Sequence, residues 1–213
     1  AELRAELIAT ARRMAANGLN KGTAGNLSVR VDQGNEHGFL ITPTGMDYET
    51  LTPSDIVFMR LDGSFEGRRK PSSEWRFHRD LYAARPEAGA VLHAHSPFAT
   101  SLACLRREIP PFHYMIARFG GDTVRCAGYA TFGTQELSDH ALAALQERSA
   151  CLLANHGMLV HGRNLKQAFD LGVELESLCE QYWRACQMGD PVLLDADEMR
   201  QVLERFSGYG QQP

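Results

Sequence analysis

The chain has 213 residues, of which 44% are hydrophobic and 23% are charged, and its formal net charge is −4. These values are ordinary for a globular protein, and the length favours one domain over residues 1–213. The charge shows no basic excess and no apolar run reaches the ~20 residues of a membrane span, so we expect neither a nucleic-acid partner nor a membrane anchor.

Two features of the sequence bear on location. Residues 1–18 form a charged amphipathic pattern without a separate apolar segment, which is not the pattern of a signal peptide. The five cysteines are scattered and include no C-x-x-C pair, which disfavours a disulfide framework and a cysteine-ligated zinc. We therefore expect a protein of the reducing cytoplasm.

The first third of the chain predicts one helix followed by strands. Apolar residues repeat at helical spacing over 3–14, and Gly18 ends the pattern. Alternating or apolar runs then predict strands at 27–31, 39–42 and 56–61, with a hairpin and loop over 62–70.

The middle of the chain predicts a helix, a strand and a second helix. Ser72 or Ser73 can cap a helix from about 74 to 84. A strand follows at 89–95, and Ser96-Pro97 starts a helix toward 105. Residues 112–121 are ambiguous between helix and loop, and 122–126 predict a short strand.

The last third predicts mostly helices. Thr134 caps a helix to 146, and buried strands follow at 151–155 and 158–161. Asn164 caps the longest helix, to about 188, and a last helix covers 195–206. The element order predicts an α/β fold, a three-layer αβα sandwich around a mostly antiparallel central sheet.

A pair of histidines at the end of the predicted strand 89–95 indicates a metal site. Side chains alternate along a strand, so His93 and His95 project from the same face. Glu74 lies at the head of the preceding predicted helix. Imidazoles with a neighbouring carboxylate are typical of a divalent metal site, and three protein ligands with an open position are typical of catalytic zinc.

Four histidines are candidates for the third imidazole ligand: His78, His113, His156 and His161. His156 directly follows a buried run, so it can meet another strand end, and we expect it to be the ligand. His161 comes one strand length later, where we expect a surface turn. His78 follows Glu74 by four residues on the same helix face, and it either supports Glu74 or simply packs.

Three loops are suited to bind an anion. Residues 70–74 place two hydroxyls and their backbone N–H groups at a helix N-terminus. The glycines of 22–26 allow N–H groups to face a ligand, although a plain tight turn explains them equally well, and 42–45 is a third loop of the same kind. None matches a nucleotide-binding motif.

Seven segments together resemble the class II aldolase/adducin family. They are GTAGNLS (22–28), TPTG (42–45), KPSSE (70–74), HAH (93–95), HYMIA (113–117), YATFGTQEL (129–137) and HG (156–157). The resemblance covers nearly the whole chain, and within the family it is strongest to aldolases that act on L-fuculose 1-phosphate. It implies a zinc-dependent aldehyde-lyase that reversibly cleaves a ketose 1-phosphate to dihydroxyacetone phosphate and an aldehyde through a zinc-stabilised enediolate.

The resemblance also implies roles for individual residues. His93, His95 and His156 would bind zinc, and Glu74 would bind the metal before substrate arrives and act as acid/base afterwards. Tyr114 would donate a proton from a neighbouring subunit of a homotetramer with active sites at its interfaces. Phosphate would bind at Thr23, Gly25, Asn26, Thr44, Gly45, Ser72 and Ser73, and the aldehyde end would contact Phe132 and Tyr209.

Several alternatives stay open within this resemblance. The substrate could be 5-deoxyribulose 1-phosphate or 5-methylthioribulose 1-phosphate, because the aldehyde end is the variable part. An epimerase ranks lower, since the family's epimerase carries aspartate where this chain has Glu74. An adducin-like interaction module would lack the histidines, which are present here. A zinc-storage or structural protein is the remaining non-enzymatic alternative.

Overall fold

Eight strands form one sheet in the order β4-β3-β2-β1-β5-β8-β7-β6. This computed structural model describes residues 2–33 and 36–206. Neighbouring strands run antiparallel except β6 and β7, which are parallel, so the expectation of a mostly antiparallel sheet is confirmed. The strands are β1 Asn26–Gln33, β2 Glu36–Ile41, β3 Val57–Arg60, β4 Phe65–Glu66, β5 Ala90–Ala94, β6 Cys126–Ala127, β7 Ala150–Leu153 and β8 Gly157–Gly162.

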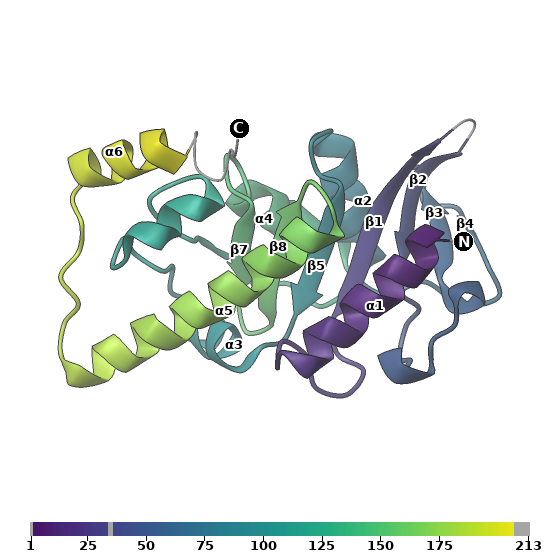
Figure 1. Cartoon of the computed structure of the whole chain (residues 1–213), viewed down its shortest axis with the longest axis horizontal. Helices are drawn as coiled ribbons and strands as arrows, with labels where there is room; N and C mark the ends of the chain where they lie inside the picture. The colour runs from purple at the N-terminus through teal and green to yellow at the C-terminus, as the bar shows by residue number, and fades with distance from the viewer. Residues whose placement is uncertain (1, 34–35, 207–213) are drawn as a thin grey trace.

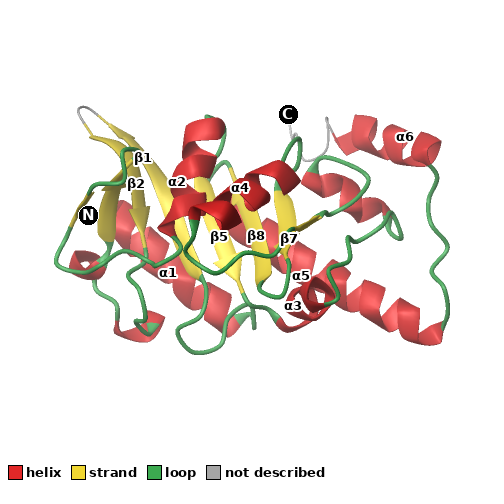
Figure 2. Cartoon of the chain, turned by 180° about the vertical axis from the view of Figure 1, so that it is seen from behind, coloured by secondary structure: helices red, strands yellow, loops and turns green. Residues whose placement is uncertain are grey.

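Helices cover both faces of the sheet and complete the expected sandwich. Helices α1, α3 and α5 lie on the face turned to the viewer in Figure 1, whereas α2 and α4 lie on the other, which Figure 2 shows. The bounds are α1 Glu2–Ala16, α2 Trp75–Ala84, α3 Pro97–Cys104, α4 Gln135–Ala144, α5 Leu165–Met188 and α6 Ala196–Phe206. In the described part of the chain, the 3₁₀ turns η1 Tyr48–Thr50 and η2 Pro53–Asp55 lie between β2 and β3, and η3 Tyr114–Phe119 lies between α3 and β6.

Side-chain alternation divides the apolar residues of the sheet between two cores. In β5, Leu92 and Ala94 join the core on the side of α1, α3 and α5, and Val91 joins the core on the side of α2 and α4. His93 therefore faces α2, where its ring lies 5.4 Å from the ring of Phe77. The strand thus presents a completely buried imidazole to the helix that begins after Glu74.

Helix α2 begins later than the sequence suggested. We expected Ser72 or Ser73 as its cap, and this is wrong: Glu74 occupies the N-cap position, and its side chain makes no capping hydrogen bond. The carboxylate instead lies beside two imidazoles, with Oε2 3.2 Å from His93 Nε2 and Oε1 3.1 Å from His156 Nε2. The Ser72 hydroxyl accepts a hydrogen bond from the Glu74 N–H at 3.3 Å.

Three further local predictions change in the structure. His161 was expected at a surface turn, which is wrong, because β8 continues to Gly162 and His161 is only 7% exposed. The ambiguous stretch 112–121 contains the 3₁₀ turn η3. The strand expected at 122–126 lies at Cys126–Ala127, preceded by a single bridge between Val124 and Ile109.

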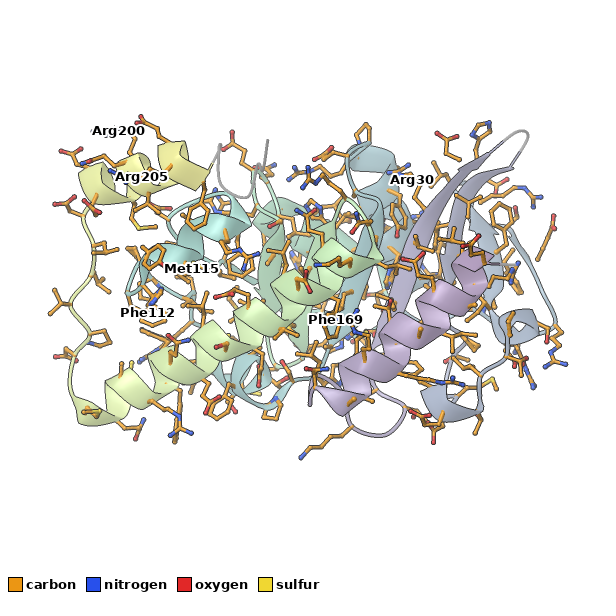
Figure 3. The ribbon with its side chains drawn as sticks, viewed as in Figure 1. Arg30, Phe112, Met115, Phe169, Arg200 and Arg205 are labelled. Atoms are coloured by element: carbon orange, nitrogen blue, oxygen red, sulfur yellow. The ribbon has the colours of Figure 1, made fainter. Side chains whose placement is uncertain are left out.

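The C-terminal helix α6 packs against η3 rather than against the sheet. Figure 3 shows Phe112 and Met115 between α5 and α6, with Arg200 and Arg205 on α6 itself. The ring of Phe112 lies 5.1 Å from that of Tyr182 on α5. No helix within the described ranges is both long and apolar enough to cross a lipid bilayer.

Glu176 on α5 secures the segment that follows the predicted metal-binding histidines. Its carboxylate accepts hydrogen bonds from the Ser96 hydroxyl at 2.6 Å and from the N–H groups of Phe98 and Ala99, both at 2.9 Å. A carboxylate at a helix N-terminus is stabilising because it pairs with exposed N–H groups and with the helix dipole. The start of α3 is therefore fixed immediately after His95.

Asp55 secures the loop that leads into residues 70–74. Its side chain is buried and accepts hydrogen bonds from the Thr52 hydroxyl and N–H, at 2.6 and 2.9 Å, and from Arg68 and Arg69, at 2.7 and 2.9 Å. The hydrogen bonds from Thr52, followed by that from Arg69, hold the pKa of Asp55 well below its usual range.

We expect Asp55→Asn to lower the free energy of unfolding at pH 7 by about 1–3 kcal/mol. The asparagine would lack the charge, and its amide nitrogen is a donor that would face the donor groups of Thr52, Arg68 and Arg69. The pKa of Asp55 is lower in the folded chain than in the unfolded one, so its contribution is present above pH ~4 and is lost as the pH falls. The gap between variant and wild type should therefore shrink on acidification.

Urea denaturation at several pH values measures this gap. Asp197→Asn is the control, because Asp197 pairs with Arg200 on the exposed surface of α6, where the expected change is below about 0.5 kcal/mol. A gap independent of pH between pH 3 and 7 would contradict the role of the Asp55 charge.

Candidate metal centre

One carboxylate and three imidazoles meet where β5 ends, β7 turns into β8 and α2 begins. The ligand atoms of Glu74, His93, His95 and His156 all lie within 4.8 Å of one another. His93 Nε2 lies 2.9 Å from His95 Nε2. The three rings stand edge to face, with centroids 4.7–4.8 Å apart and interplanar angles of 75–79°. Residues far apart in the sequence therefore form one compact N₃O donor set.

The turn between β7 and β8 brings His156 into the cluster. Asn155 has a φ of +53°, a left-handed conformation that asparagine tolerates better than most residues. Gly157 follows, and a Cβ there would lie 2.4 Å from the carbonyl oxygen of Ala94 and 3.0 Å from the His95 ring. The turn can approach the end of β5 this closely because residue 157 is glycine.

The backbone determines which nitrogen of His93 is free. His93 Nδ1 lies 2.8 Å from the carbonyl oxygen of Met158, which can only accept, so Nδ1 carries the proton. When the ring is neutral, as metal binding requires, Nε2 is the nitrogen whose lone pair faces the centre of the cluster. This arrangement, in which the backbone fixes the tautomer of an imidazole, is typical of metal-binding histidines.

The charges of the cluster also suit a metal ion. Burial, together with the charges of His93 and His156, lowers the pKa of His95 to about 4, so His95 is neutral at pH 7 and can bind a metal. Burial alone would raise the pKa of Glu74, but the adjacent imidazoles outweigh it and the pKa falls well below its usual value. Glu74 Oε1 is buried and makes no hydrogen bond among the described residues, although His156 Nε2 is 3.1 Å away.

A buried carboxylate oxygen without a hydrogen bond and three converging imidazoles fit a divalent cation. Nitrogen ligands with one carboxylate suit zinc and other first-row divalent metals, and no cysteine takes part. A metal held by these side chains would act as a Lewis acid toward an oxygen of a bound molecule.

A cavity of about 320 Å³ opens from the cluster. Glu74, His95 and His156 are among the residues that line it. The other lining residues include all seven predicted phosphate-binding residues, Thr23, Gly25, Asn26, Thr44, Gly45, Ser72 and Ser73. The three loops that the sequence singled out separately therefore surround one space.

Part of the expected backbone donor set is used within the protein. We expected the N–H of Ser72 to face an anion, and this is wrong, because it donates to the Thr42 carbonyl at 3.0 Å. The Thr44 N–H likewise donates to the Lys70 carbonyl at 3.2 Å. The two loops pair across the bridge between Pro43 and Pro71, so Ser72 and Thr44 can offer a ligand their hydroxyls.

The remaining predicted residues lie in different places. Phe132 lines the cavity and is 64% exposed. Tyr114 lies in η3, 51% exposed, and lines a separate hollow beside α6, where its ring stacks 6.4 Å from Phe206. Tyr209 lies outside the described residues. Within one chain the structure therefore brings Phe132, but not Tyr114, to the cavity.

Sequence reasoning missed three residues around the cluster. Tyr129 and Asn155 line the cavity, and Asn20 Oδ1 accepts a hydrogen bond from the His95 N–H at 3.3 Å. Tyr129 begins the segment 129–137, which resembles the family, and Asn155 directly precedes His156, so the sequence indicated the neighbourhood of both. Nothing in the sequence indicated Asn20, because its contact with His95 depends on tertiary packing.

Comparison with known proteins gives a consistent set of relatives. Residues 5–183 match the family described as Class II Aldolase and Adducin N-terminal domain. The chain is 58% identical over 208 residues to a 5-methylthioribulose-1-phosphate/5-deoxyribulose-1-phosphate aldolase of Rhodospirillum rubrum, covering 98% of this chain and 92% of the relative. It is 47% identical over 210 residues to an L-fuculose phosphate aldolase of Escherichia coli, covering 98% and 96%.

A solved structure gives the same result in three dimensions. A protein named L-fuculose 1-phosphate aldolase superposes with a TM-score of 0.92 at 43% identity, covering 97% of each chain. The fold and the sequence therefore point to one group of proteins.

The cluster predicts that the chain binds a divalent ion through its histidines. Loss of a residue that only supports a metal ligand weakens metal affinity by about 10–100-fold. We expect His93→Ala to weaken the affinity for the metal ion by more than this, because it removes a direct ligand. Competition with a chelator measures the affinity. His140→Ala is the control, since His140 lies on α4 and contacts only the exposed Glu136 among the ion pairs of the described residues. Equal affinity in the two variants would rule out the site.

Proposed function

This chain belongs to the class II aldolase and adducin family, and on that premise we propose that it is a zinc-dependent aldolase that cleaves a ketose 1-phosphate to dihydroxyacetone phosphate and an aldehyde. The family, the relatives named as aldolases of phosphorylated sugars, and the cluster of Glu74 with three histidines together make it a metal-dependent class II aldolase acting on phosphorylated sugars. The observation that carries the finer proposal is the single cavity that joins Glu74 and two imidazoles to the phosphate-binding loops.

The residues divide into two groups along the cavity. His93, His95 and His156 would hold the zinc ion, which as a Lewis acid would polarise the ketone and offset the negative charge that develops as the carbon–carbon bond breaks. Hydroxyls of Thr23, Thr44, Ser72 and Ser73 and backbone groups of the glycine loops would hold the phosphate. The phosphate position would thereby set which carbon lies at the metal.

Glu74 is suited to move the proton. Its oxygen Oε2 accepts a hydrogen bond from Asn26 Nδ2 at 2.9 Å, and Oε1 lies beside His156 without a hydrogen bond among the described residues. One oxygen is therefore held while the other is free to take or give a proton. In the cleavage direction the carboxyl group would give a proton to the carbon of the dihydroxyacetone phosphate product, and in synthesis it would take that proton back. The proton of the hydroxyl that becomes the aldehyde oxygen would pass through Tyr114, which returns it in synthesis.

Tyr114 supports the proposal of a homotetramer. Its phenol is exposed at the surface beside α6, and a neighbouring copy could receive it in its own cavity. A phenol O–H is a hydrogen-bond donor and can give its proton to an aldehyde oxygen. We extend the proposal to Tyr209 at the aldehyde end of the substrate and to a cytoplasmic location, which the scattered cysteines favour.

Two substrate classes are equally well supported. The resemblance to L-fuculose phosphate aldolases favours L-fuculose 1-phosphate, and these relatives are 47% identical. The relative at 58% identity acts, by its name, on 5-methylthioribulose 1-phosphate and 5-deoxyribulose 1-phosphate. The aromatic rings of Tyr129 and Phe132 at the cavity mouth fit the apolar end of either aldehyde.

A substrate panel tests the reaction. We expect release of dihydroxyacetone phosphate from at least one of L-fuculose 1-phosphate, 5-deoxyribulose 1-phosphate and 5-methylthioribulose 1-phosphate, and loss of release after chelation with recovery on added Zn²⁺. A coupled assay that reduces dihydroxyacetone phosphate measures the rate, and the ratio of kcat/KM values ranks the substrates. Cleavage of none of the three would reject the proposal, and so would chelator-resistant activity.

Glu74→Gln separates proton transfer from metal binding. We expect a kcat lower by about 10²–10⁴-fold, because an amide cannot exchange the proton, while the histidines still bind zinc. The measurements are kcat and the zinc content of the same preparation. Glu136→Gln, on the exposed face of α4, is the control. A zinc-loaded Glu74→Gln protein with wild-type kcat would remove Glu74 from the mechanism.

A further inference from the structure

A row of buried hydrogen bonds runs from Glu74 through Asn26 into the interior of the protein. Tyr82 Oη lies 2.8 Å from Ser28 Oγ, and Ser28 Oγ lies 2.7 Å from His78 Nδ1. His78 Nε2 lies 2.5 Å from Asn26 Oδ1, and Asn26 Nδ2 lies 2.9 Å from Glu74 Oε2. We call these five residues the Tyr82–Glu74 chain.

Two regular elements supply its members. Asn26 and Ser28 are two residues apart on β1, so they share one face of the strand. His78 and Tyr82 are four residues apart on α2, so they share one face of the helix. Arg30, labelled in Figure 3, holds the two elements together by donating to the Tyr82 carbonyl oxygen at 2.8 Å.

Starting from the Glu74 carboxylate, the donor and acceptor groups allow only one direction for each hydrogen bond in the row. An ionised carboxylate only accepts, so Asn26 must turn its nitrogen to Glu74. Asn26 Oδ1 then faces His78 and can only accept, so His78 Nε2 carries a hydrogen and donates it. The orientation of the Asn26 amide and the tautomer of His78 therefore determine each other.

The half of the Tyr82–Glu74 chain that lies farther from Glu74, from His78 to Tyr82, agrees with this direction. His78 is completely buried, and burial lowers its pKa to about 3, so the ring is neutral and Nδ1 has a lone pair. The Ser28 hydroxyl donates to that lone pair and accepts from Tyr82. Burial raises the pKa of Tyr82, which keeps its proton. The side-chain nitrogen and oxygen atoms of Asn26, His78, Ser28 and Tyr82 are thus all paired, which is the condition under which a buried network is rigid.

We propose that His78 is a positioning residue for Glu74: by donating from Nε2 to Asn26, it keeps the Asn26 amide nitrogen on Glu74 Oε2 and Oε1 beside His156. The inference rests on the proposed acid/base function of Glu74. With the donor removed, the Asn26 amide can rotate, and an amide oxygen facing Oε2 would repel it. The carboxylate would then lose its fixed orientation.

Two amide substitutions at one position separate positioning from packing. A glutamine places its amide nitrogen near the site of Nε2, so His78→Gln keeps a donor for Asn26. An asparagine reaches only the site of Nδ1, so His78→Asn keeps the contact with Ser28 and leaves Asn26 without its donor. Both variants bury a neutral amide in the same helix, and Leu81→Val, buried one turn further along, is a packing control.

We expect His78→Asn to lower kcat by about 10–100-fold with little change in KM, and His78→Gln to recover most of the loss. Leu81→Val should lower the melting temperature without changing kcat. In the metal-free wild-type protein, ¹⁵N NMR at pH 7 should show His78 protonated at Nε2 and not at Nδ1. Equal kcat losses in His78→Asn and His78→Gln, matched by equal drops in melting temperature, would overturn the inference.

The inference and the proposed function fail in different ways. If the wild-type protein cleaves none of the ketose 1-phosphates, the proposed function is rejected. The tautomer of His78, measured by ¹⁵N NMR without any substrate, then tests the inference. A His78 ring protonated at Nδ1, or at both nitrogens, overturns the inference even in an active enzyme, because Ser28 would then no longer be the donor and the direction of the chain would be lost.

Discussion

The contact between Glu74 and the imidazoles of His93 and His156 joins three segments that are far apart in the sequence. A carboxylate as buried as Glu74, at 7% exposure, is costly unless charges and hydrogen bonds compensate it. Here the compensation comes from His93 at 3.2 Å, His156 at 3.1 Å and Asn26 at 2.9 Å. The start of α2, the end of β5 and the β7–β8 turn must therefore keep their relative positions, and much of the remaining structure maintains them.

Buried polar contacts outside the cluster hold those segments in place. Arg30 donates to the carbonyl oxygens of Tyr82, Arg85 and Ala88, which joins β1 to the end of α2. Glu176 fixes the start of α3 immediately after His95. Each of these groups bonds to backbone, so each sets the position of a segment rather than of one side chain. Such positioning matters because a displacement of about 1 Å at an active site can cost about 10²-fold in rate.

The sequence predicted the parts of the site that follow from local periodicity. Alternation along the strand predicted that His93 and His95 lie together, and they do, although His95 lies one residue beyond the end of β5. His156 could be chosen because it follows a buried run. The element order was sufficient for an α/β sandwich with a mostly antiparallel sheet. Contacts between loops were beyond this reasoning. The N–H of Ser72 is used by the Thr42 carbonyl, thirty residues away, and neither segment has a periodicity that would pair them.

The residues in and around the cavity differ in how much freedom they leave for substitution. In the cluster, His93 is fully buried, Glu74 is 7% exposed, and the hydrogen bonds behind Glu74 are fixed in direction, so a change there leaves a buried polar group unpaired. Phe132 and Tyr129, which also line the cavity, are 64% and 53% exposed, so their substitution costs little stability. A chain built in this way can keep one bond-breaking chemistry while the aldehyde it accepts changes, and the relatives at 58% and 47% identity carry the names of different sugar phosphates.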